Sequence, residues 1–223
     1  MVGLANHMSN DPPNASFAAP ALQPDLDWTY TPESSTLPAT ATSDSRLMDL
    51  YFEFFHHAHP CVLPRRFLER FLSDERAKLL LQVIYYIGSL FDPLVSSDIL
   101  QDKVNSALSY TRSGQKPTHA FDVGAVLLYS IAIYWRQGSD EGTALLKESI
   151  FMASNLGMHR KGFASQNGQG DVVLEECWRR TWWQIFMADA HLAGAAHTSA
   201  LHTRDIEMTV DLPCEESEYE TGV

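Results

Sequence analysis

Three of the five tryptophans in this chain stand within the short segment Glu175–Trp183. Read as a helix, the segment and its flanks place one set of side chains on a single face, at spacings of three and four residues. This face consists of Leu174, Trp178, Thr181, Trp182, Ile185 and Asp189. Glu175 and Glu176 each stand four residues before an arginine, the better order for ion pairs on a helix. The pattern predicts a helix that organises a core, without catalytic chemistry.

Charge and cysteine content restrict the partners of the chain. The formal net charge of -12 over 223 residues repels phosphate, so we expect no direct binding to DNA or to an anionic membrane. Cys61, Cys177 and Cys214 are far apart, which favours a reducing compartment and predicts neither disulfides nor a cysteine-based zinc site. No signal peptide or membrane-spanning stretch is recognisable, and we expect a soluble intracellular protein.

The first 45 residues differ from the rest. They contain six of the eleven prolines, and the first lysine or arginine is Arg46. A segment of this kind buries too little apolar surface to offset the entropy lost on ordering. We therefore expect a disordered leader over residues 1–45 and a helical domain over residues 46–223. Within the leader, the acidic and aromatic cluster Pro24–Tyr30 is interpreted as a linker rather than as a docking or activation motif.

From Asp44 onward the apolar residues follow a helical period. No strand alternation and no internal repeat is recognisable, so the predicted class is all-α, an array of antiparallel helices with short connections. Residues 162–171 are expected to be a flexible loop, and residues 203–223 to be mostly irregular. Asp98 and Gln101 have the spacing of a capping box, and Gly157 is expected to end a helix. Seven helices are expected. The first begins near residue 43, the second at 64 and the fourth near 98. The third, fifth and sixth span 74–91, 121–137 and 140–156, and the seventh is the tryptophan-rich helix.

Residues that could carry chemistry are few. His56, His57 and His59 are close together, but Pro60 interrupts the backbone and no carboxylate or cysteine completes a ligand set at metal spacing. We interpret them as helix-end histidines favoured by the helix dipole. No nucleophile elbow and no phosphate-binding loop is present. We predict no catalytic residue and no metal ligand.

Arg179 and Arg180 could bind a phosphate or carboxylate ligand. The preferred interpretation is that Glu175, Glu176 and Asp189 neutralise both arginines and that both stack on tryptophan rings.

The order Glu176–Trp183 and then Asp189 resembles the central signature of the fungal-specific transcription factor domain. This domain is the middle homology region downstream of Zn2Cys6 binuclear-cluster DNA-binding modules. Three other stretches resemble the family in the same order, and together they cover about residues 46–220: Tyr51–Pro64, Ala144–Arg160 and Asp205–Glu216. The signature residues, to which we assign a structural role, are Trp178, Arg179, Arg180, Trp182, Trp183 and Asp189.

The resemblance implies an α-helical regulatory domain of a nuclear transcription factor. In the family this domain tunes DNA binding and activation, in some members in response to metabolites and often in a dimer. The zinc cluster needs six closely spaced cysteines and a basic flank. This sequence has neither, so zinc is expected only in a module absent from this chain. Ala195, Ala196 and His197 also stand where many members have Gly-Arg-Pro.

We therefore expect a shortened relative, whether a fragment, a truncated product or a stand-alone modulator. It would contact a full-length regulator, a coactivator or a second copy of itself. The sequence Leu212–Glu216 resembles that of regulators of secondary-metabolite pathways.

The alternative function is a metabolite-sensing helical domain. Tyr129, Tyr134 and Trp135 are expected to share one aromatic region with Trp182, suited to an apolar small-molecule effector. Plain core packing is the preferred explanation of these rings. An enzyme is not predicted, because nothing in the sequence places His159, Asp189 and Glu176 together.

Overall fold

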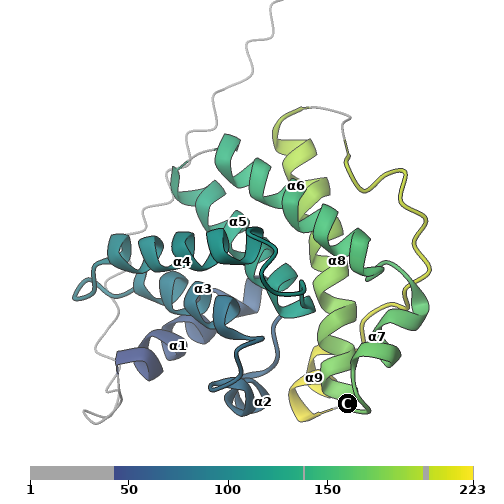
Figure 1. Ribbon diagram of the computed structural model, residues 1–223, viewed down its shortest axis with the longest axis horizontal. Coiled ribbons are helices and arrows are strands. Elements are labelled where there is room, and N and C mark those ends of the chain that lie inside the picture. The colour runs from purple at the N-terminus through teal and green to yellow at the C-terminus, as the bar shows by residue number, and fades with distance from the viewer. Residues whose placement is uncertain (1–42, 138, 198–200, 223) are drawn as a thin grey trace, which may run out of the picture. The chain divides into compact units, whose positions relative to one another are not determined.

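The computed structural model describes residues 43–137, 139–197 and 201–222. This part of the chain consists of helices and turns without a strand, which confirms the all-α class (Figure 1). The α-helices are α1 (Ser43–Phe54), α2 (Arg65–Leu68), α3 (Lys78–Ser89), α4 (Ser97–Arg112), α5 (Ala120–Gln137), α6 (Ser139–Leu156), α7 (Lys161–Asn167), α8 (Val172–Ala195) and α9 (Glu216–Thr221). Two short 3-10 turns are η1 (His56–Ala58) and η2 (Glu69–Phe71).

The expected leader lies almost entirely outside the described residues. Its last three residues, 43–45, form the first turn of α1, so the helical region begins slightly before the expected boundary at residue 46.

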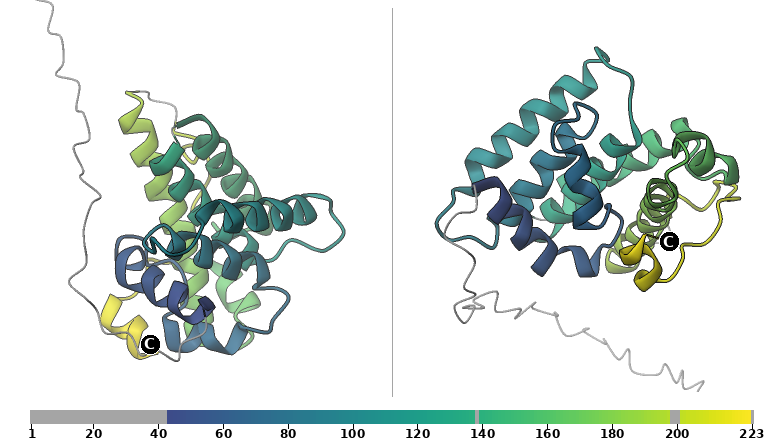
Figure 2. Two further views of the ribbon diagram at one scale, coloured as in Figure 1. Left: turned by 90° about the vertical axis from the view of Figure 1, so that its left-hand side faces the viewer. Right: turned by 90° about the horizontal axis from the view of Figure 1, so that it is seen from below.

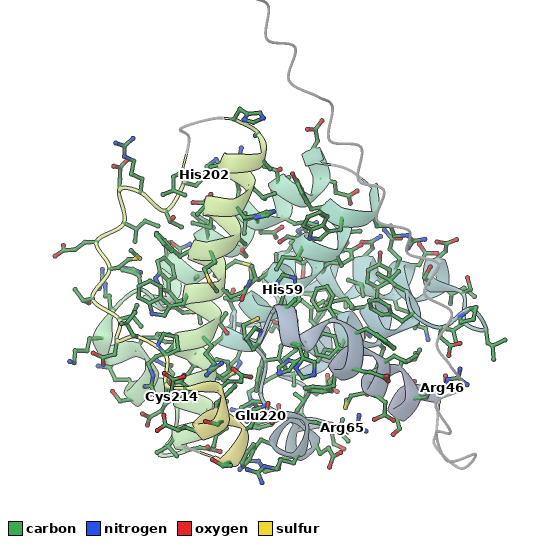
Figure 3. All side chains as sticks on the ribbon, turned by 180° about the vertical axis from the view of Figure 1, so that it is seen from behind. Arg46, His59, Arg65, His202, Cys214 and Glu220 are labelled. Atoms are coloured by element: carbon green, nitrogen blue, oxygen red, sulfur yellow. The ribbon has the colours of Figure 1, made fainter. Side chains whose placement is uncertain are left out.

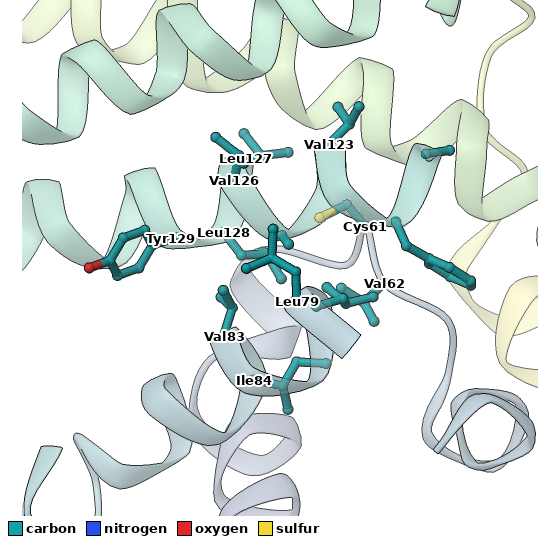
Figure 4. Packing of buried hydrophobic residues seen from close by; sticks show 14 of the residues in the cluster. Cys61, Val62, Leu79, Val83, Ile84, Val123, Val126, Leu127, Leu128 and Tyr129 are labelled. Atoms are coloured by element: carbon teal, nitrogen blue, oxygen red, sulfur yellow. The ribbon is translucent and has the colours of Figure 1, made fainter. Parts of the chain in front are cut away.

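Helix α3 is at the centre of the first half of the domain and packs against α1, α4 and α5. It is apolar on nearly every side, as the sequence predicted. Figure 4 shows Leu79 and Val83 on the side of α3 that faces α5, whereas Ile84 lies on the opposite side of the helix. The helix begins at Lys78 rather than near Asp74, because the carboxylate of Asp74 accepts the backbone N–H and the guanidinium of Arg76 and holds a turn there.

Helices α5 and α6 pack along each other, and α6 ends where the sequence predicted. Gly157 has a φ of 82°, a left-handed conformation that glycine adopts without strain. The N–H of Gly157 bonds the carbonyl of Ser154, and that of Met158 bonds the carbonyl of Ala153, each at 3.0 Å. This is the Schellman arrangement that satisfies the last carbonyls of a helix.

Two local predictions were wrong, and a third was incomplete. The expected loop over residues 162–171 contains α7, which buries Phe163 and Ala164 and packs against α8. Residues 203–215 are irregular, as predicted, but they are followed by the short helix α9, which was not predicted and whose Tyr219 is fully buried. In both cases tertiary packing stabilises a helix that is too short to persist alone. The capping box at the start of α4 does not form: Ser96 is the N-cap residue, and Asp98 instead pairs with Arg136 of α5 at 3.1 Å.

Gly88 sets the distance between α1 and α3. A Cβ at this position would lie 1.9 Å from the backbone oxygen of Leu47, and backbone atoms cannot rotate away. Gly88→Ala is therefore expected to lower the free energy of unfolding by about 1–3 kcal/mol or more, the cost of overpacking. Urea unfolding followed by circular dichroism measures it.

Gly124→Ala is the matched control, since a Cβ on this α5 glycine would meet nothing within 4 Å. It should be neutral or stabilise by up to about 1 kcal/mol, because alanine has the higher helix propensity. Equal effects of the two substitutions would contradict the close approach of α1 and α3.

Candidate functional site

Helix α8 carries the predicted apolar face into the core. Its N-terminus is capped by Asp171, whose carboxylate accepts the N–H groups of Val173 and Leu174 at 3.0 and 3.2 Å. All six residues of the predicted face are buried, from Leu174 to Asp189. The assignment of this segment as a core-organising helix is therefore correct.

The three tryptophans of α8 contact three different parts of the domain. Trp178 packs edge-on against Phe121 of α5, with ring centroids 4.9 Å apart. Trp182 has no exposed surface, and its ring centroid lies 5.5 Å from that of His159. Trp183 is half-buried, and its indole N–H donates to the carbonyl of Asp211 at 3.0 Å. The segment thus connects the core to the chain that follows α8.

Arg180 is the centre of a buried polar cluster. Its side chain is only 7% exposed, and its Nε donates to Oε1 of Glu176 at 3.0 Å. Its Nη2 donates to the carbonyl of Cys214 at 2.8 Å, and Nη1 bonds the carboxylate of Glu216. The guanidinium also lies 4.3 Å from the centroid of the Tyr219 ring. One arginine therefore binds both the backbone and the side chains of the C-terminal segment, residues 201–222.

Glu176 completes this cluster from the other side. Its side chain is 1% exposed, and its Oε1 accepts the backbone N–H of Cys214 at 2.9 Å. Glu176 and Arg180 together thus bind the N–H and the carbonyl of the same residue. Burial works to lower the pKa of Arg180, but the hydrogen bond and charge of Glu216 outweigh it and the pKa is raised, so the guanidinium stays charged.

The predicted partners of the two arginines were right only in part. Arg179 bonds Glu176 at 2.7 Å rather than Glu175, and the ring beside Arg180 is Tyr219 rather than a tryptophan. Asp189 does not neutralise either arginine, because its carboxylate is occupied by the C-terminal segment.

Asp189 is a second attachment point for that segment. It is 1% exposed and accepts the N–H and the hydroxyl of Thr203 at 2.7 and 2.8 Å. Its other oxygen is 2.9 Å from Nδ1 of His202. In Figure 3, His202 lies near one end of α8, and Cys214 and Glu220 lie near the other. Asp189 and the Glu176–Arg180 pair therefore hold the C-terminal segment along α8.

The cysteines are not poised for chemistry. Burial raises the pKa of the Cys177 thiol to about 12 and also raises that of Cys61, so both stay protonated at neutral pH. Burial and then the nearby charge of Glu176 raise the pKa of Cys214. This agrees with the interpretation of Cys177 as a small buried apolar residue.

The four rings expected to share one ligand region have different surroundings. Tyr129 is buried, donates from its hydroxyl to Asn105 at 2.7 Å and lies edge-on to Tyr86. Trp135 is 56% exposed and contacts the rings of Tyr134 and His191, whereas Trp182 lies beside His159. An open hollow of about 800 Å³ lies elsewhere, along α3 and α4, and is lined by residues such as Lys78, Gln82, Lys103 and Tyr110.

One group of potential ligand atoms was missed from the sequence. Donor atoms of His56, Glu216 and Glu220 lie within 4.8 Å of one another. The spacing of the histidines in sequence gives no sign of this group, because Glu216 and Glu220 are far from His56 along the chain.

The comparison with known families places the chain. Residues 48–222 match the family described as "Fungal specific transcription factor domain". The chain belongs to this family, so it is a domain of transcription regulation and not an enzyme. The match confirms the resemblance. It extends from α1 through α9 and so includes both α8 and the C-terminal segment.

One relative is the "C6 finger domain transcription factor iacK" of Pestalotiopsis fici. It is 29% identical over 184 residues, which make up 82% of this chain and 27% of the relative. The chain thus spans about a quarter of the length of the curated relative that it matches. No solved structure matches the chain. Within the part of the chain that the structure describes, no helix has the length and apolar character needed to span a bilayer.

Glu176→Gln tests the buried pair. The substitution removes the negative charge while Arg180 stays buried, and breaking a buried pair in this way costs about 3–5 kcal/mol. We expect that loss in the free energy of unfolding, measured by urea titration. The control is Glu175→Gln, the same change one residue earlier on α8. Glu175 is half-buried but forms no ion pair with the described residues, so its substitution should cost about 1 kcal/mol or less. Similar losses in both variants would show that the pair is not the stabilising element.

Asp189→Ala tests the second attachment point. Without the carboxylate, the N–H and hydroxyl of Thr203 lose their acceptor, and the chain beside Arg204 should open more often. At 25 °C we expect trypsin to cleave after Arg204 about tenfold faster, because losing these bonds lowers the free energy of local opening by about 1.4 kcal/mol, which is a factor of ten. Glu207→Ala, at an exposed residue that does not flank the cleaved bond, should leave the rate unchanged. Equal cleavage rates in the two variants would rule out this role for Asp189.

Proposed function

We propose that this chain acts in the nucleus as a regulatory domain of a zinc-cluster transcription factor system, through contacts with other proteins. The family match over residues 48–222 carries the proposal. It covers the tryptophan-rich helix and the C-terminal segment as one unit, and the structure holds the same two elements together through Arg180 and Asp189.

The chemistry of the chain favours proteins over DNA as its direct partner. Its net charge of -12 opposes the phosphate contacts that supply most nonspecific affinity for DNA. Its three cysteines are fewer than the six that a Zn2Cys6 cluster requires. Large apolar side chains are exposed at several places, among them Leu94, Trp135 and Phe151, at 80%, 56% and 66%. Apolar surface of this kind is available for association with a full-length regulator, a coactivator or a second copy of the chain.

We extend the proposal to the control of a secondary-metabolite pathway. The support is the resemblance of Leu212–Glu216 to the corresponding element of such regulators. In this protein the element is held in place, since both backbone groups of Cys214 and the carboxylate of Glu216 bond α8. The metabolite-sensing alternative stays a prediction, because Tyr129, Trp135 and Trp182 lie in separate surroundings.

A tethering experiment tests the proposed function. The full chain is fused to an unrelated DNA-binding module and expressed in a fungal reporter strain. Because the chain is proposed to recruit or restrain other proteins, the fusion should change reporter transcription severalfold relative to the module alone, in either direction. The Glu175→Gln fusion should keep the effect, and the Glu176→Gln fusion, with its destabilised C-terminal segment, should lose it.

A binding measurement completes the test. By fluorescence anisotropy at physiological salt, the unfused chain should show no sequence-specific affinity for promoter fragments. Light scattering on the same sample distinguishes self-association from partnership with another protein. Tight specific DNA binding by the unfused chain, or a fusion that leaves the reporter at the level of the module alone, would overturn the proposal.

A further inference from the structure

Three potential metal ligands meet where α9 packs against η1. His56 belongs to η1, and Glu216 and Glu220 belong to α9. Their donor atoms lie within 4.8 Å of one another, and Nε2 of His56 is 3.9 Å from Oε1 of Glu220. The two glutamates are four residues apart, so they lie on the same face of α9, one turn from each other. The views of Figure 2 show α9 beside the N-terminal part of α8, near the turn that follows α1.

His56 is an unusual buried residue. Its side chain is 3% exposed, yet neither ring nitrogen has a hydrogen-bond partner among the described residues. Buried polar atoms in folded proteins nearly always have one. The imidazole is held by the rings of Phe52 and Tyr51, with centroid distances of 4.7 and 5.9 Å. A fixed imidazole with an unsatisfied nitrogen close to two carboxylates is the arrangement that a cation would complete.

We propose that His56, Glu216 and Glu220 bind a divalent transition-metal cation, with Zn²⁺ as the ion that fits best. One imidazole and two carboxylates are ligand types that Zn²⁺ accepts, and a fourth position can be taken by water because both glutamates are 49% exposed. Two carboxylate charges also balance a doubly charged ion. Burial lowers the pKa of His56 to about 4, which leaves the ring neutral at neutral pH, the form that binds metals.

Neighbouring cations leave room for the ion. Arg180 bonds one oxygen of Glu216, and the carboxylate has a second oxygen that this bond does not use. Arg66 donates to the backbone carbonyl of Glu220 at 2.6 Å. Metal–ligand bonds of about 2.0–2.2 Å require the donors to move closer than they are. The glutamates can supply this movement, because their exposed side chains can change rotamer while His56 stays fixed.

A bound ion would join α9 to η1 beside the buried Arg180 cluster. It would therefore add a third attachment for the C-terminal segment, after those at Asp189 and at Glu176–Arg180. This inference is independent of the proposed function. It implies that the concentration of available metal affects how stably the C-terminal segment is attached.

The test uses the full chain, stripped with EDTA and dialysed. Zn²⁺ is titrated by calorimetry and in competition with a chromophoric chelator. We expect one Zn²⁺ per chain and a rise in melting temperature, since an ion that binds only the folded state stabilises it. Glu220→Gln should weaken binding at least about tenfold, comparable to the loss of a supporting ligand contact, and abolish the rise. Glu207→Gln, an exposed glutamate of the same segment, should behave as the unmodified chain.

Cobalt provides a second readout that needs no variant. Co²⁺ bound to one imidazole and two carboxylates should give weak visible bands without a thiolate charge-transfer band. A thiolate band would place the ion on a cysteine such as Cys214 and overturn the proposal. So would the absence of Zn²⁺ binding, or unchanged affinity in a Glu220→Gln chain whose circular dichroism shows it to be folded.

Discussion

The buried pair of Glu176 and Arg180 is the interaction on which the second half of the structure depends. Removing two charges from water is costly, and the pair alone would not offset that cost. The offset comes from further bonds to the backbone of Cys214, to Glu216 and to the carbonyl of Pro60. The turn after α1, the helix α8 and the C-terminal segment are therefore linked by one set of hydrogen bonds centred on this pair.

This dependence gives the tryptophan-rich signature a physical meaning. Its tryptophans attach α8 to α5, to the turn at His159 and to the chain at Asp211, while Arg180 and Asp189 hold the segment that returns along the helix. The hollow along α3 and α4 is lined by no residue of the signature. We interpret the signature as a scaffold element, in agreement with a family of regulatory domains rather than enzymes.

Much of the fold could be predicted from local pattern, and the failures have a common cause. The buried face of α8, the central position of α3 and the end of α6 at Gly157 follow from periodicity and backbone preference, which are local properties. Helices α7 and α9 were missed because Phe163 and Tyr219 stabilise them only by packing against distant residues. Asp189 was assigned to the arginines because sequence distance suggested it, whereas the fold brings Thr203 to its carboxylate.

The sequence by itself determined the helical class, the face that α8 buries, the absence of recognisable catalytic motifs and the family. Each of these depends on residue types at spacings of a few positions. Only the tertiary structure decided which charges pair, which short segments become helical, and that His56 meets Glu216 and Glu220. Those outcomes depend on which segments far apart in sequence come into contact. The packing of the whole core decides these contacts, and no local pattern does.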